Sequence, residues 1–340
     1  MEFEFDASDL QGLQRVVALV GPTGVGKTEA SLEMARRLNA EIVSVDSLQV
    51  YRKLDVGTAK LTDERRQEIS HHLLDVVDPD EEFNAADYCR LAHDAIDDIV
   101  ERGKVPLLVG GTGLYLRMLV HGIFDAPPKS EALRNEYAQI AEEKGRDVLH
   151  ERLQDVDPEL ADKVHPNDLV RVTRGLEVYD QTGKPLSQHQ REHRFRAPNY
   201  HALKVVLIRP REELYERINR RAEIMVERGL MEEYQGVLDE GYKRDLKPLQ
   251  SLGYRQMGQV LAGEMEIDEA LSEMQKYTRR YAKQQISWFR GEPQTHWAMA
   301  PLVDGDGRLP PTALADLRRF LEGGSPELEW AKVDPYNVER

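Results

Sequence analysis

The sequence contains a single cysteine and no long apolar segment. Cys89 has no second cysteine for an internal disulfide, and one thiolate cannot build a multi-cysteine zinc site. No stretch reaches the roughly 18 consecutive apolar residues that a membrane-spanning helix requires. The first nine residues carry four acidic and no basic side chains, which argues against an ordinary secretory signal. These absences predict a protein of the reducing cytoplasm with no membrane partner.

Basic residues are outnumbered by acidic ones and unevenly distributed. The 340 residues include 46 Lys and Arg against 61 Asp and Glu, a formal net charge of −15. That total alone argues against nucleic-acid binding. However, a phosphate backbone responds to charges within roughly 10 Å, so a local basic patch can act despite the total. Residues 274–290 form such a stretch, with five basic residues and no acidic one.

Short apolar runs alternate with helical patterns along most of the chain. The runs cover residues 14–20, 41–45, 105–109 and 204–208. Each is typical of a buried parallel strand. The clearest helix begins after Asn84, a favoured N-cap residue, and ends before Gly103, which suits the C′ position. The alternation predicts an α/β fold, with a mostly parallel sheet covered by helices on both faces.

A complete P-loop pattern, GxxxxGK[ST], follows the first apolar run. It reads Gly21-Pro22-Thr23-Gly24-Val25-Gly26-Lys27-Thr28. Its glycines let backbone N–H groups curl around an anion, and the helix predicted from residue 29 adds partial positive charge at its N-terminus. We expect Lys27 to supply a point charge and the Thr28 hydroxyl to bind Mg²⁺. The motif predicts a site for a magnesium-bound diphosphate or triphosphate and leaves the reaction open.

The strand–helix alternation lapses in the middle of the chain, between two proline-containing hinges. We interpret residues 128–198 as a mainly helical insertion, because this stretch has helical patterns but no apolar strand run. The predicted P-loop core then comprises residues 14–127 together with 199–297. Residues 298–340 contain no recognisable motif. Their proline and glycine pairs and their acidic charges predict a loosely attached tail.

Further motifs lie at expected strand ends and in the second half of the chain. Asp46 and the loop from Gly110 each follow an apolar run, at the carboxyl edge of the sheet where open α/β folds bind ligands. The motifs are Asp46-Ser47-Leu48-Gln49-Val50-Tyr51-Arg52, Thr58-Ala59-Lys60, His71-His72-Leu73, Gly110-Gly111-Thr112-Gly113-Leu114-Tyr115, His165-Pro166-Asn167-Asp168, Thr182-Gly183-Lys184-Pro185-Leu186-Ser187 and Gly253-Tyr254-Arg255-Gln256-Met257.

Together and in this order, these motifs closely resemble those of the tRNA dimethylallyltransferases, from about residue 17 to residue 290. Leu61, where proline is common, and Leu252, where isoleucine or valine is usual, depart from the family pattern outside the proposed chemistry. The resemblance implies a P-loop NTPase-like fold. It also implies transfer of the dimethylallyl group from dimethylallyl diphosphate to the exocyclic amine of the adenosine 3′ of a tRNA anticodon. The implied partners are dimethylallyl diphosphate, the anticodon stem-loop and Mg²⁺, and we expect a monomer.

The residues of the P-loop edge suit this reaction. Diphosphate departure builds negative charge on oxygens that Lys27, the loop amides and Mg²⁺ can stabilise. The Thr23 hydroxyl can hydrogen-bond the leaving oxygen. Asp46 is our candidate general base, because the adenine amine must lose a proton as the new bond forms. The alternative is that Asp46 holds Mg²⁺ through water, as an acid at this edge does in many P-loop enzymes.

Two arginines on the predicted helix 212–228 are further candidates for the diphosphate site. Arg217 and Arg221 lie four residues apart at the margin of its apolar stripe, so either can bend toward an anion. We hypothesise that one of them clamps the diphosphate. The alternative is ordinary pairing with Glu213 or Glu216.

RNA contacts are expected from several parts of the chain. The candidates are Asp46, Ser47, Leu48, Gln49, Thr112, Arg134, Arg171, Arg174, Gly253, Tyr254, Arg255, Lys283 and Arg290. For Thr112, the alternative is a turn residue that bonds its own loop. In the predicted helix 268–290 the basic residues share an arc of roughly 100°, which suits a surface that follows phosphates. An ordinary solvated face is the alternative. The apolar residues expected opposite are Leu271, Met274, Tyr281, Ile286 and Phe289.

Three other functions fit part of the pattern. A P-loop small-molecule kinase would use the same loop and acid but leaves the basic helix unexplained. An adenylate isopentenyltransferase, which prenylates free adenine nucleotides, shares the front half, whereas the insertion and the stretches 253–257 and 283–290 favour tRNA. A nucleotide-gated RNA-binding protein would bind tRNA without making a product.

Overall fold

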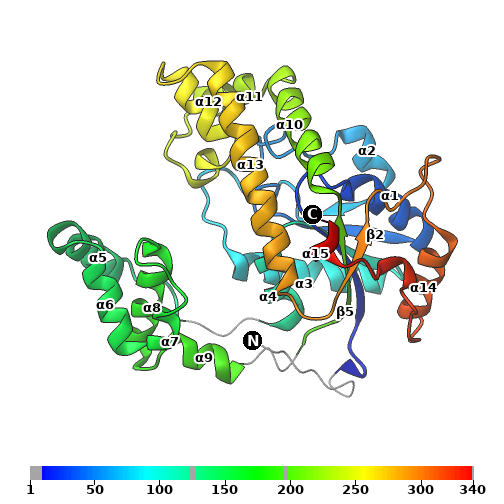
Figure 1. The fold of residues 1–340 in the computed structure, drawn as a ribbon, viewed down its shortest axis with the longest axis horizontal. Coiled ribbons are helices and arrows are strands. Elements are labelled where there is room, and N and C mark those ends of the chain that lie inside the picture. The colour runs from blue at the N-terminus through cyan, green and yellow to red at the C-terminus, as the bar shows by residue number, and fades with distance from the viewer. Residues whose placement is uncertain (1–9, 123–126, 194–197, 339–340) are drawn as a thin grey trace. The chain divides into compact units, whose positions relative to one another are not determined.

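The computed structural model of the protein describes residues 10–122, 127–193 and 198–338 (Figure 1). The chain divides into two compact units. One runs from His121 to Pro198, and the other combines Leu10–Val120 with Asn199–Arg340. The smaller unit corresponds to the insertion that the sequence predicts from residue 128. Each unit contains its own buried apolar side chains.

A six-stranded parallel sheet forms the centre of the larger unit. Its strands are β1 (Arg15–Val20), β2 (Ala40–Val45), β3 (His71–His72), β4 (Val105–Gly110), β5 (His201–Ile208) and β6 (Thr295–Met299). Their order across the sheet is β3-β2-β4-β1-β5-β6. The four predicted strands are confirmed. The sequence does not predict β3 and β6, because these short strands at the two edges contain histidines and lack an apolar run.

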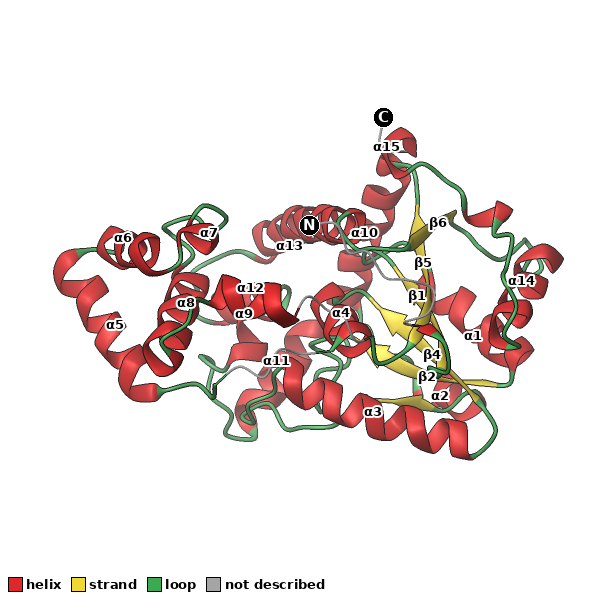
Figure 2. Cartoon of the chain, turned by 90° about the horizontal axis from the view of Figure 1, so that it is seen from below, coloured by secondary structure: helices red, strands yellow, loops and turns green. Residues whose placement is uncertain are grey.

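Helices cover both faces of this sheet. The helices of the larger unit are α1 (Lys27–Leu38), α2 (Asp63–Glu68), α3 (Ala85–Glu101), α4 (Gly113–His121), α10 (Arg211–Glu227), α11 (Leu230–Asp239), α12 (Tyr254–Leu261), α13 (Ile267–Arg290), α14 (Pro311–Leu321) and α15 (Pro335–Val338). Of these, α11 and α12 pack mainly on other helices. The β1–β2 and β3–β4 connections run in opposite directions across the sheet, so right-handed crossovers place α1 and α3 on opposite faces. Accordingly, α1 and α14 lie on one side of the sheet and α3 and α4 on the other (Figure 2).

Local capping explains the boundaries of α3. The Asn84 side chain accepts hydrogen bonds from the backbone N–H groups of Ala86 and Asp87, and the Asp87 carboxylate accepts one from the Asn84 N–H. This reciprocal arrangement satisfies amides that the first helical turn leaves unpaired. Gly103 follows the helix with a φ of 70°, the left-handed conformation typical of a C′ glycine. The predicted helix is therefore confirmed at both ends.

The insertion is helical, as predicted. Its helices are α5 (Glu131–Lys144), α6 (Asp147–Val156), α7 (Pro158–Ala161), α8 (Leu169–Thr182) and α9 (Leu186–His193). They enclose a core of Tyr137, Leu149, Leu153, Ala161, Val164, Val172 and Leu176. Gly175 of α8 lets Leu160 and Leu153 approach closely, because an added Cβ would lie only 2.6 and 2.7 Å from their side-chain carbons.

Within the predicted tail of residues 298–340, the described residues 298–338 pack onto the sheet and its helices, so the prediction of a loosely attached tail is wrong. The α14 helix contacts β1 and α1 and buries Ala313, Leu314, Leu317 and Phe320. Arg15 of β1 donates to the carbonyl oxygen of Phe320 over 2.6 Å. Asp316 of α14 in turn accepts a hydrogen bond from the Trp330 indole over 3.0 Å. The proline pair forms the start of an amphipathic helix, with Pro310 as its N-cap, and does not mark a break in the fold.

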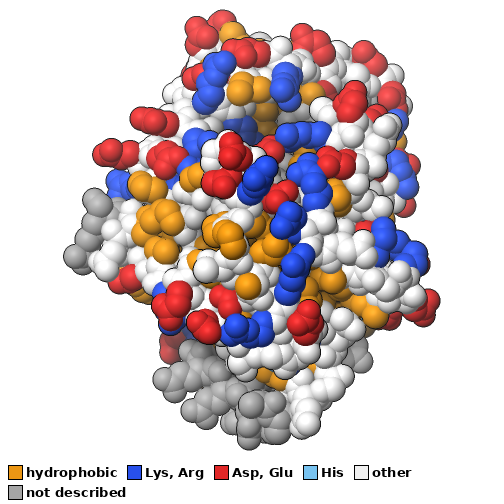
Figure 3. Space-filling model, turned by 90° about the vertical axis from the view of Figure 1, so that its right-hand side faces the viewer, with side chains coloured by type: hydrophobic (Ala, Val, Ile, Leu, Met, Phe, Trp, Pro, Cys, Tyr) orange, Lys and Arg blue, Asp and Glu red, His pale blue; other side chains and the backbone are white. Residues whose placement is uncertain are grey.

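The surface carries both signs of charge. On the face drawn in Figure 3, Lys and Arg side chains are interspersed with Asp and Glu. Among the described residues, no helix combines the length and the apolar character needed to cross a membrane. Because both signs of charge mix on the face drawn, a basic surface has to be identified on individual elements on which Lys and Arg gather.

Candidate active site

Three neighbouring strands bring the predicted motifs to one edge of the sheet. Val20 of β1 and Val45 of β2 both pair with Gly110 of β4, so these strands end level with one another. The P-loop follows β1, Asp46 follows β2, and the loop of residues 110–113 (hereafter the glycine loop) contains the end of β4. The strand order therefore assembles the three motifs that the sequence places at strand ends.

The P-loop conformation depends on its glycines. Gly26, directly before α1, has a φ of 107°, which side chains with a Cβ rarely adopt. Gly21 lies so close to β5 that an added Cβ would be 2.6 Å from the carbonyl oxygen of Leu207. Because α1 starts at Lys27, its unpaired amides and the positive end of its dipole face the loop.

Lys27 is held inside the loop. Its ammonium donates to the carbonyl oxygens of Gly21 and Pro22, both over 2.9 Å. Burial, with a smaller contribution from the positive charge of Arg221, lowers its pKa to about 7, although Asp46 acts in the opposite direction. A bound anion would favour the charged form and raise this pKa. The site is thus a cluster of positive groups suited to an anionic ligand.

Both candidate arginines of α10 face this cluster. Arg217 donates from Nε to the carbonyl oxygen of Gly24 over 2.9 Å. Burial lowers the pKa of Arg221, the charge of Asp46 raises it, and that of Arg217 lowers it. Arg221 is therefore close enough to the acid and to Lys27 for their charges to interact.

The alternative pairing with acids of α10 is absent. Within the described residues neither Arg217 nor Arg221 forms an ion pair with Glu213 or Glu216; Glu213 pairs instead with Arg209. Arg209 is a site residue that was not predicted from the sequence. It is buried at the end of β5, and its Nε donates to the carbonyl oxygen of a P-loop residue, Val25, over 2.7 Å. Its position directly after a predicted strand was the available signal.

Asp46 caps the turn that follows β2. Its Oδ1 accepts hydrogen bonds from the backbone N–H groups of Leu48, over 2.9 Å, and Gln49, over 3.2 Å. Its Oδ2 makes no hydrogen bond to any residue that the structure describes. One carboxylate oxygen is thus fixed by the backbone while the other remains available to a ligand.

Thr112 and Gln49 already have partners in the protein. The Thr112 hydroxyl accepts a hydrogen bond from the Ser47 N–H over 3.1 Å, so it joins the glycine loop to the Asp46 turn and does not bond its own loop. The Gln49 side chain accepts from the Ser44 hydroxyl and donates to the carbonyl oxygen of Thr58, both over 3.2 Å. An RNA contact through these groups would add to, or replace, these hydrogen bonds.

Comparisons with known proteins identify the family. The family model described as IPP transferase matches residues 49–292, which is most of the chain. The chain belongs to the IPP transferase family.

The relatives and structural neighbours of the chain are named as enzymes that transfer a dimethylallyl or isopentenyl group to tRNA. The tRNA dimethylallyltransferase of Syntrophobacter fumaroxidans is 51% identical over 282 residues, which cover 83% of this chain and 82% of the relative. Among solved structures, the tRNA isopentenylpyrophosphate transferase of Bacillus halodurans has a TM-score of 0.65 and 39% identity, covering 91% of this chain and 96% of that one. A eukaryotic dimethylallyltransferase acting on tRNA has a TM-score of 0.78 and 28% identity, covering 93% and 82% respectively.

Two residues predicted to contact tRNA in this family member are buried. Gly253 and Tyr254 are buried, and the Tyr254 hydroxyl donates to Glu233 over 2.5 Å. The Tyr254 side chain therefore packs inside the protein, and a tRNA contact at this position stays a prediction. Arg255 is partly exposed and lies over the ring of Tyr277, with its guanidinium carbon 5.3 Å from the ring centre.

The basic face of α13 is narrower than the sequence predicts. The exposed basic residues are Lys276, Arg280 and Lys283. Arg279 is half-buried and donates to the Asn219 side chain over 2.5 Å. Arg290 donates to the carbonyl oxygen of Pro335 over 2.7 Å and lies over the ring of Tyr336. We call the three exposed residues the α13 basic face.

Tyr281 and Gln285 of α13 reach the active-site loops. Tyr281, expected on the buried side, is 37% exposed. Burial of its hydroxyl and the charge of Asp46 raise its pKa to about 12, although hydrogen bonding to Thr112 and Gln285 acts in the opposite direction. Gln285 is buried and accepts a hydrogen bond from the backbone N–H of Thr23 over 2.9 Å. The sequence alone assigns no role to Gln285.

The arginines predicted to contact tRNA from the insertion surround an acid. Arg134 and Arg174 pair with buried Glu177, over 3.1 and 2.6 Å. Burial alone would raise the pKa of Glu177, but these hydrogen bonds outweigh it and hold the pKa below its usual value. Arg171 is exposed and lies 3.3 Å from Asp168. Arg134 of α5 and Arg174 of α8 therefore have a structural role. The tRNA contact that the sequence predicts for them would be additional to this role.

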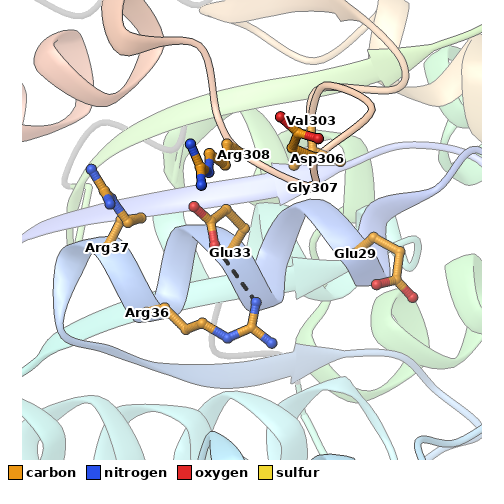
Figure 4. A pocket seen from close by; sticks show the side chains of 8 residues that line it. All are labelled: Glu29, Glu33, Arg36, Arg37, Val303, Asp306, Gly307 and Arg308. Carbon is orange, nitrogen blue, oxygen red and sulfur yellow. Dashed lines mark ion pairs between the residues drawn. The ribbon is translucent and has the colours of Figure 1, made fainter.

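Two cavities lie at the surface of the larger unit. One of about 450 Å³ lies between α1 and residues 303–308, outside the three site loops (Figure 4). Its lining includes an ion pair between Glu33 and Arg36, 3.6 Å apart. A second, of about 100 Å³, opens between α10 and α13. Its lining residues are Arg209, Arg211, Leu214, Tyr215, Lys283 and Ile286. Because Arg209 bonds Val25, this smaller cavity adjoins the P-loop.

Proposed function

We propose that the protein transfers the dimethylallyl group from dimethylallyl diphosphate to the exocyclic amine of the adenosine 3′ of a tRNA anticodon and releases diphosphate. The level ends of three neighbouring strands carry this proposal, because they place an anion-binding P-loop beside a carboxylate and a second loop. Relatives named tRNA dimethylallyltransferase, identical at about half of the aligned positions, support it.

Catalysis on the donor side is electrostatic. As the carbon–oxygen bond of the allylic ester breaks, the electron pair moves onto the diphosphate oxygens. Lys27, the P-loop amides and the α10 arginines stabilise this charge. The Thr23 hydroxyl donates to the oxygen that leaves. Leu214 and Ile286 line the small cavity beside the loop and suit a five-carbon apolar group.

On the acceptor side, the adenosine amine attacks the carbon that diphosphate is leaving. The amine nitrogen forms a bond to that carbon and loses one proton. Asp46 is the proposed base: two backbone N–H groups hold its Oδ1, and its Oδ2 accepts the proton. An anticodon-loop base must leave its stack to reach this carboxylate. The α13 basic face suits the phosphates of the RNA that flanks it.

The same site suits Mg²⁺. Thr28 is exposed at the start of α1, and its hydroxyl has no hydrogen-bond partner among the described residues. Those residues contain no group of three or more His, Cys, Asp or Glu arranged to hold a metal. This agrees with the usual behaviour of Mg²⁺, which takes one or two protein ligands plus substrate phosphates. When bound by Thr28 and the diphosphate, it would neutralise charge on the leaving group. We propose that the enzyme works as a cytoplasmic monomer.

One assay tests the proposal against its alternatives. The protein is incubated with labelled dimethylallyl diphosphate, Mg²⁺ and either unmodified tRNA or AMP. We expect label in tRNA, at the adenosine 3′ of the anticodon, and diphosphate as the second product. Label in AMP alone would identify an adenylate isopentenyltransferase. Binding of tRNA with no labelled product, or phosphoryl transfer from ATP, would overturn the assignment.

A further inference from the structure

The Gln285 side chain connects the P-loop to the glycine loop. Its Oε1 accepts a hydrogen bond from the Thr23 N–H in the P-loop over 2.9 Å. Its Nε2 donates to the carbonyl oxygen of Gly111 in the glycine loop over 3.0 Å. A neutral amide is suited to this place, because it can accept at one end and donate at the other.

The glycines of the glycine loop allow side chains of α13 to pack closely against it. A Cβ on Gly111 would lie 2.3 Å from the Gln285 Nε2, and a Cβ on Gly113 would lie 2.1 Å from the Trp288 ring. A side chain at either position would displace the Gln285 amide or the Trp288 ring. These glycines therefore allow close packing by α13, in addition to any contact they make with substrate.

A parallel connection runs from α13 to the proposed base. The Tyr281 hydroxyl, one turn before Gln285, lies close enough to Thr112 and Gln285 for hydrogen bonding to them to lower its pKa. Thr112 in turn accepts the hydrogen bond from the Ser47 N–H, next to Asp46. Gln285 thus joins the P-loop to the glycine loop, and Thr112 joins the glycine loop to the Asp46 turn.

We propose that Gln285 is a positioning residue that sets the separation between the diphosphate cradle and the acceptor side of the site. This inference rests on the proposed transferase function. Transfer requires the amine nitrogen to approach the allylic carbon in line with the departing oxygen, and such alignment accounts for much of the rate of a two-substrate reaction. In the proposed reaction the diphosphate binds to the P-loop and the amine approaches Asp46, whose turn is joined to the glycine loop by Thr112. A side chain that bridges the P-loop and the glycine loop therefore controls the alignment of the two substrates.

Paired substitutions test this role. Gln285→Glu keeps the acceptor for Thr23 but places a carboxylate oxygen against the Gly111 carbonyl, and Gln285→Met removes both hydrogen bonds. We expect kcat to fall about 10- to 100-fold in both variants, as a small misplacement of reacting groups does. KM for tRNA should stay within about twofold of the wild-type value. Gln284→Glu and Gln284→Met are matched controls on the exposed side of α13 and should leave kcat unchanged.

A pH profile separates positioning from simple packing. When the carboxyl group that Gln285→Glu introduces is protonated, its O–H can again donate to the Gly111 carbonyl while the other oxygen accepts from Thr23. The kcat of Gln285→Glu relative to wild type should therefore rise as pH falls, and Gln285→Met should show no such recovery. The rates are measured under single-turnover conditions. The thermal unfolding transition of each variant verifies that it is folded, so that unfolded protein does not lower the measured rate.

The outcomes are distinguishable. A wild-type protein that makes no prenylated tRNA would overturn the proposed function and this inference with it. An active wild type, together with folded Gln285 variants whose kcat lies within twofold of it, would overturn the inference alone. A loss of kcat in Gln285→Glu that does not recover at low pH would also overturn it, by showing that the site needs the packing of the amide and not its two hydrogen bonds.

Discussion

Arg217 donates to the carbonyl oxygen of Gly24 across 193 residues of sequence, over 2.9 Å. This hydrogen bond, together with packing of Ile218 against the same glycine, holds α10 beside the P-loop. As a result, Arg221, one turn further along the helix, lies near Lys27 and Asp46. Helix α10 thus supplies positive charge to a loop that is distant from it in the sequence.

Replacement of Arg221 by methionine should weaken donor binding. We expect KM for dimethylallyl diphosphate to rise about 10- to 100-fold, because a hydrogen bond to a charged group contributes roughly 1.5–3 kcal/mol. Arg220→Met is the matched control, since Arg220 is exposed and pairs with Glu223. An unchanged KM in Arg221→Met would remove Arg221 from the diphosphate site and leave Arg217 as the candidate.

Asp46→Asn separates the two roles open to Asp46. The amide oxygen of asparagine can still accept the hydrogen bonds from Leu48 and Gln49, so the turn should keep its shape. Loss of a general base should lower kcat about 10²- to 10⁴-fold, with KM for dimethylallyl diphosphate within about twofold. If diphosphate binding weakens instead, while turnover at saturation survives, Asp46 serves Mg²⁺ and is not the base.

Diphosphate binding should weaken above neutral pH. Lys27 has a pKa of about 7 without ligand, and an anion beside it raises that pKa. Between these two values binding takes up a proton at Lys27. The association constant divided by that of Lys27→Arg, which cancels the titration of diphosphate itself, should therefore fall as pH rises, approaching tenfold per pH unit. Calorimetry with inorganic diphosphate from pH 6 to 9, without metal, measures this. Lys27→Arg stays charged throughout, so a constant ratio of the two affinities would contradict the prediction.

The sequence predicts the parts of the site whose chemistry is local. The P-loop, Asp46 and the glycine loop each follow an apolar strand, and strand ends in a parallel sheet meet at one edge, so their proximity follows from pattern alone. The caps of α3 are predictable for the same reason, because Asn84 and Gly103 act on adjacent backbone.

The residues that sequence reasoning missed act across long separations. Gln285 lies in a helix whose charges suggested RNA, and its function as a bridge depends on where Gly111 and Thr23 lie in the fold. Burial of Tyr254 likewise depends on a partner in another helix, Glu233. A motif identifies such residues as part of the family pattern but does not distinguish a surface contact from an internal one.

Glu233 should contribute substantially to stability. Its carboxylate accepts hydrogen bonds from the backbone N–H groups of residues 55, 56 and 57 as well as from Tyr254. Glu233→Ala leaves these donors without their partner, so the free energy of unfolding should fall by about 2–4 kcal/mol. Urea denaturation measures this. Glu232→Ala, at an exposed neighbouring position, should change it by less than about 0.5 kcal/mol, and equal effects of the two substitutions would argue against the role of Glu233.

Lys283 and Arg290 should differ in their contribution to tRNA binding, although both belong to the predicted basic ridge. Lys283 is exposed on the α13 basic face, whereas Arg290 is held by Pro335 and the Tyr336 ring. Neutralising a residue that contacts a phosphate releases fewer counterions, so Lys283→Ala should weaken tRNA binding and reduce the slope of log K against log salt by about 0.7–0.9. Arg290→Ala should change that slope less. Filter-binding titrations across a range of salt concentrations provide the comparison, and a larger slope change in Arg290→Ala would place the RNA at the C-terminal end of α13.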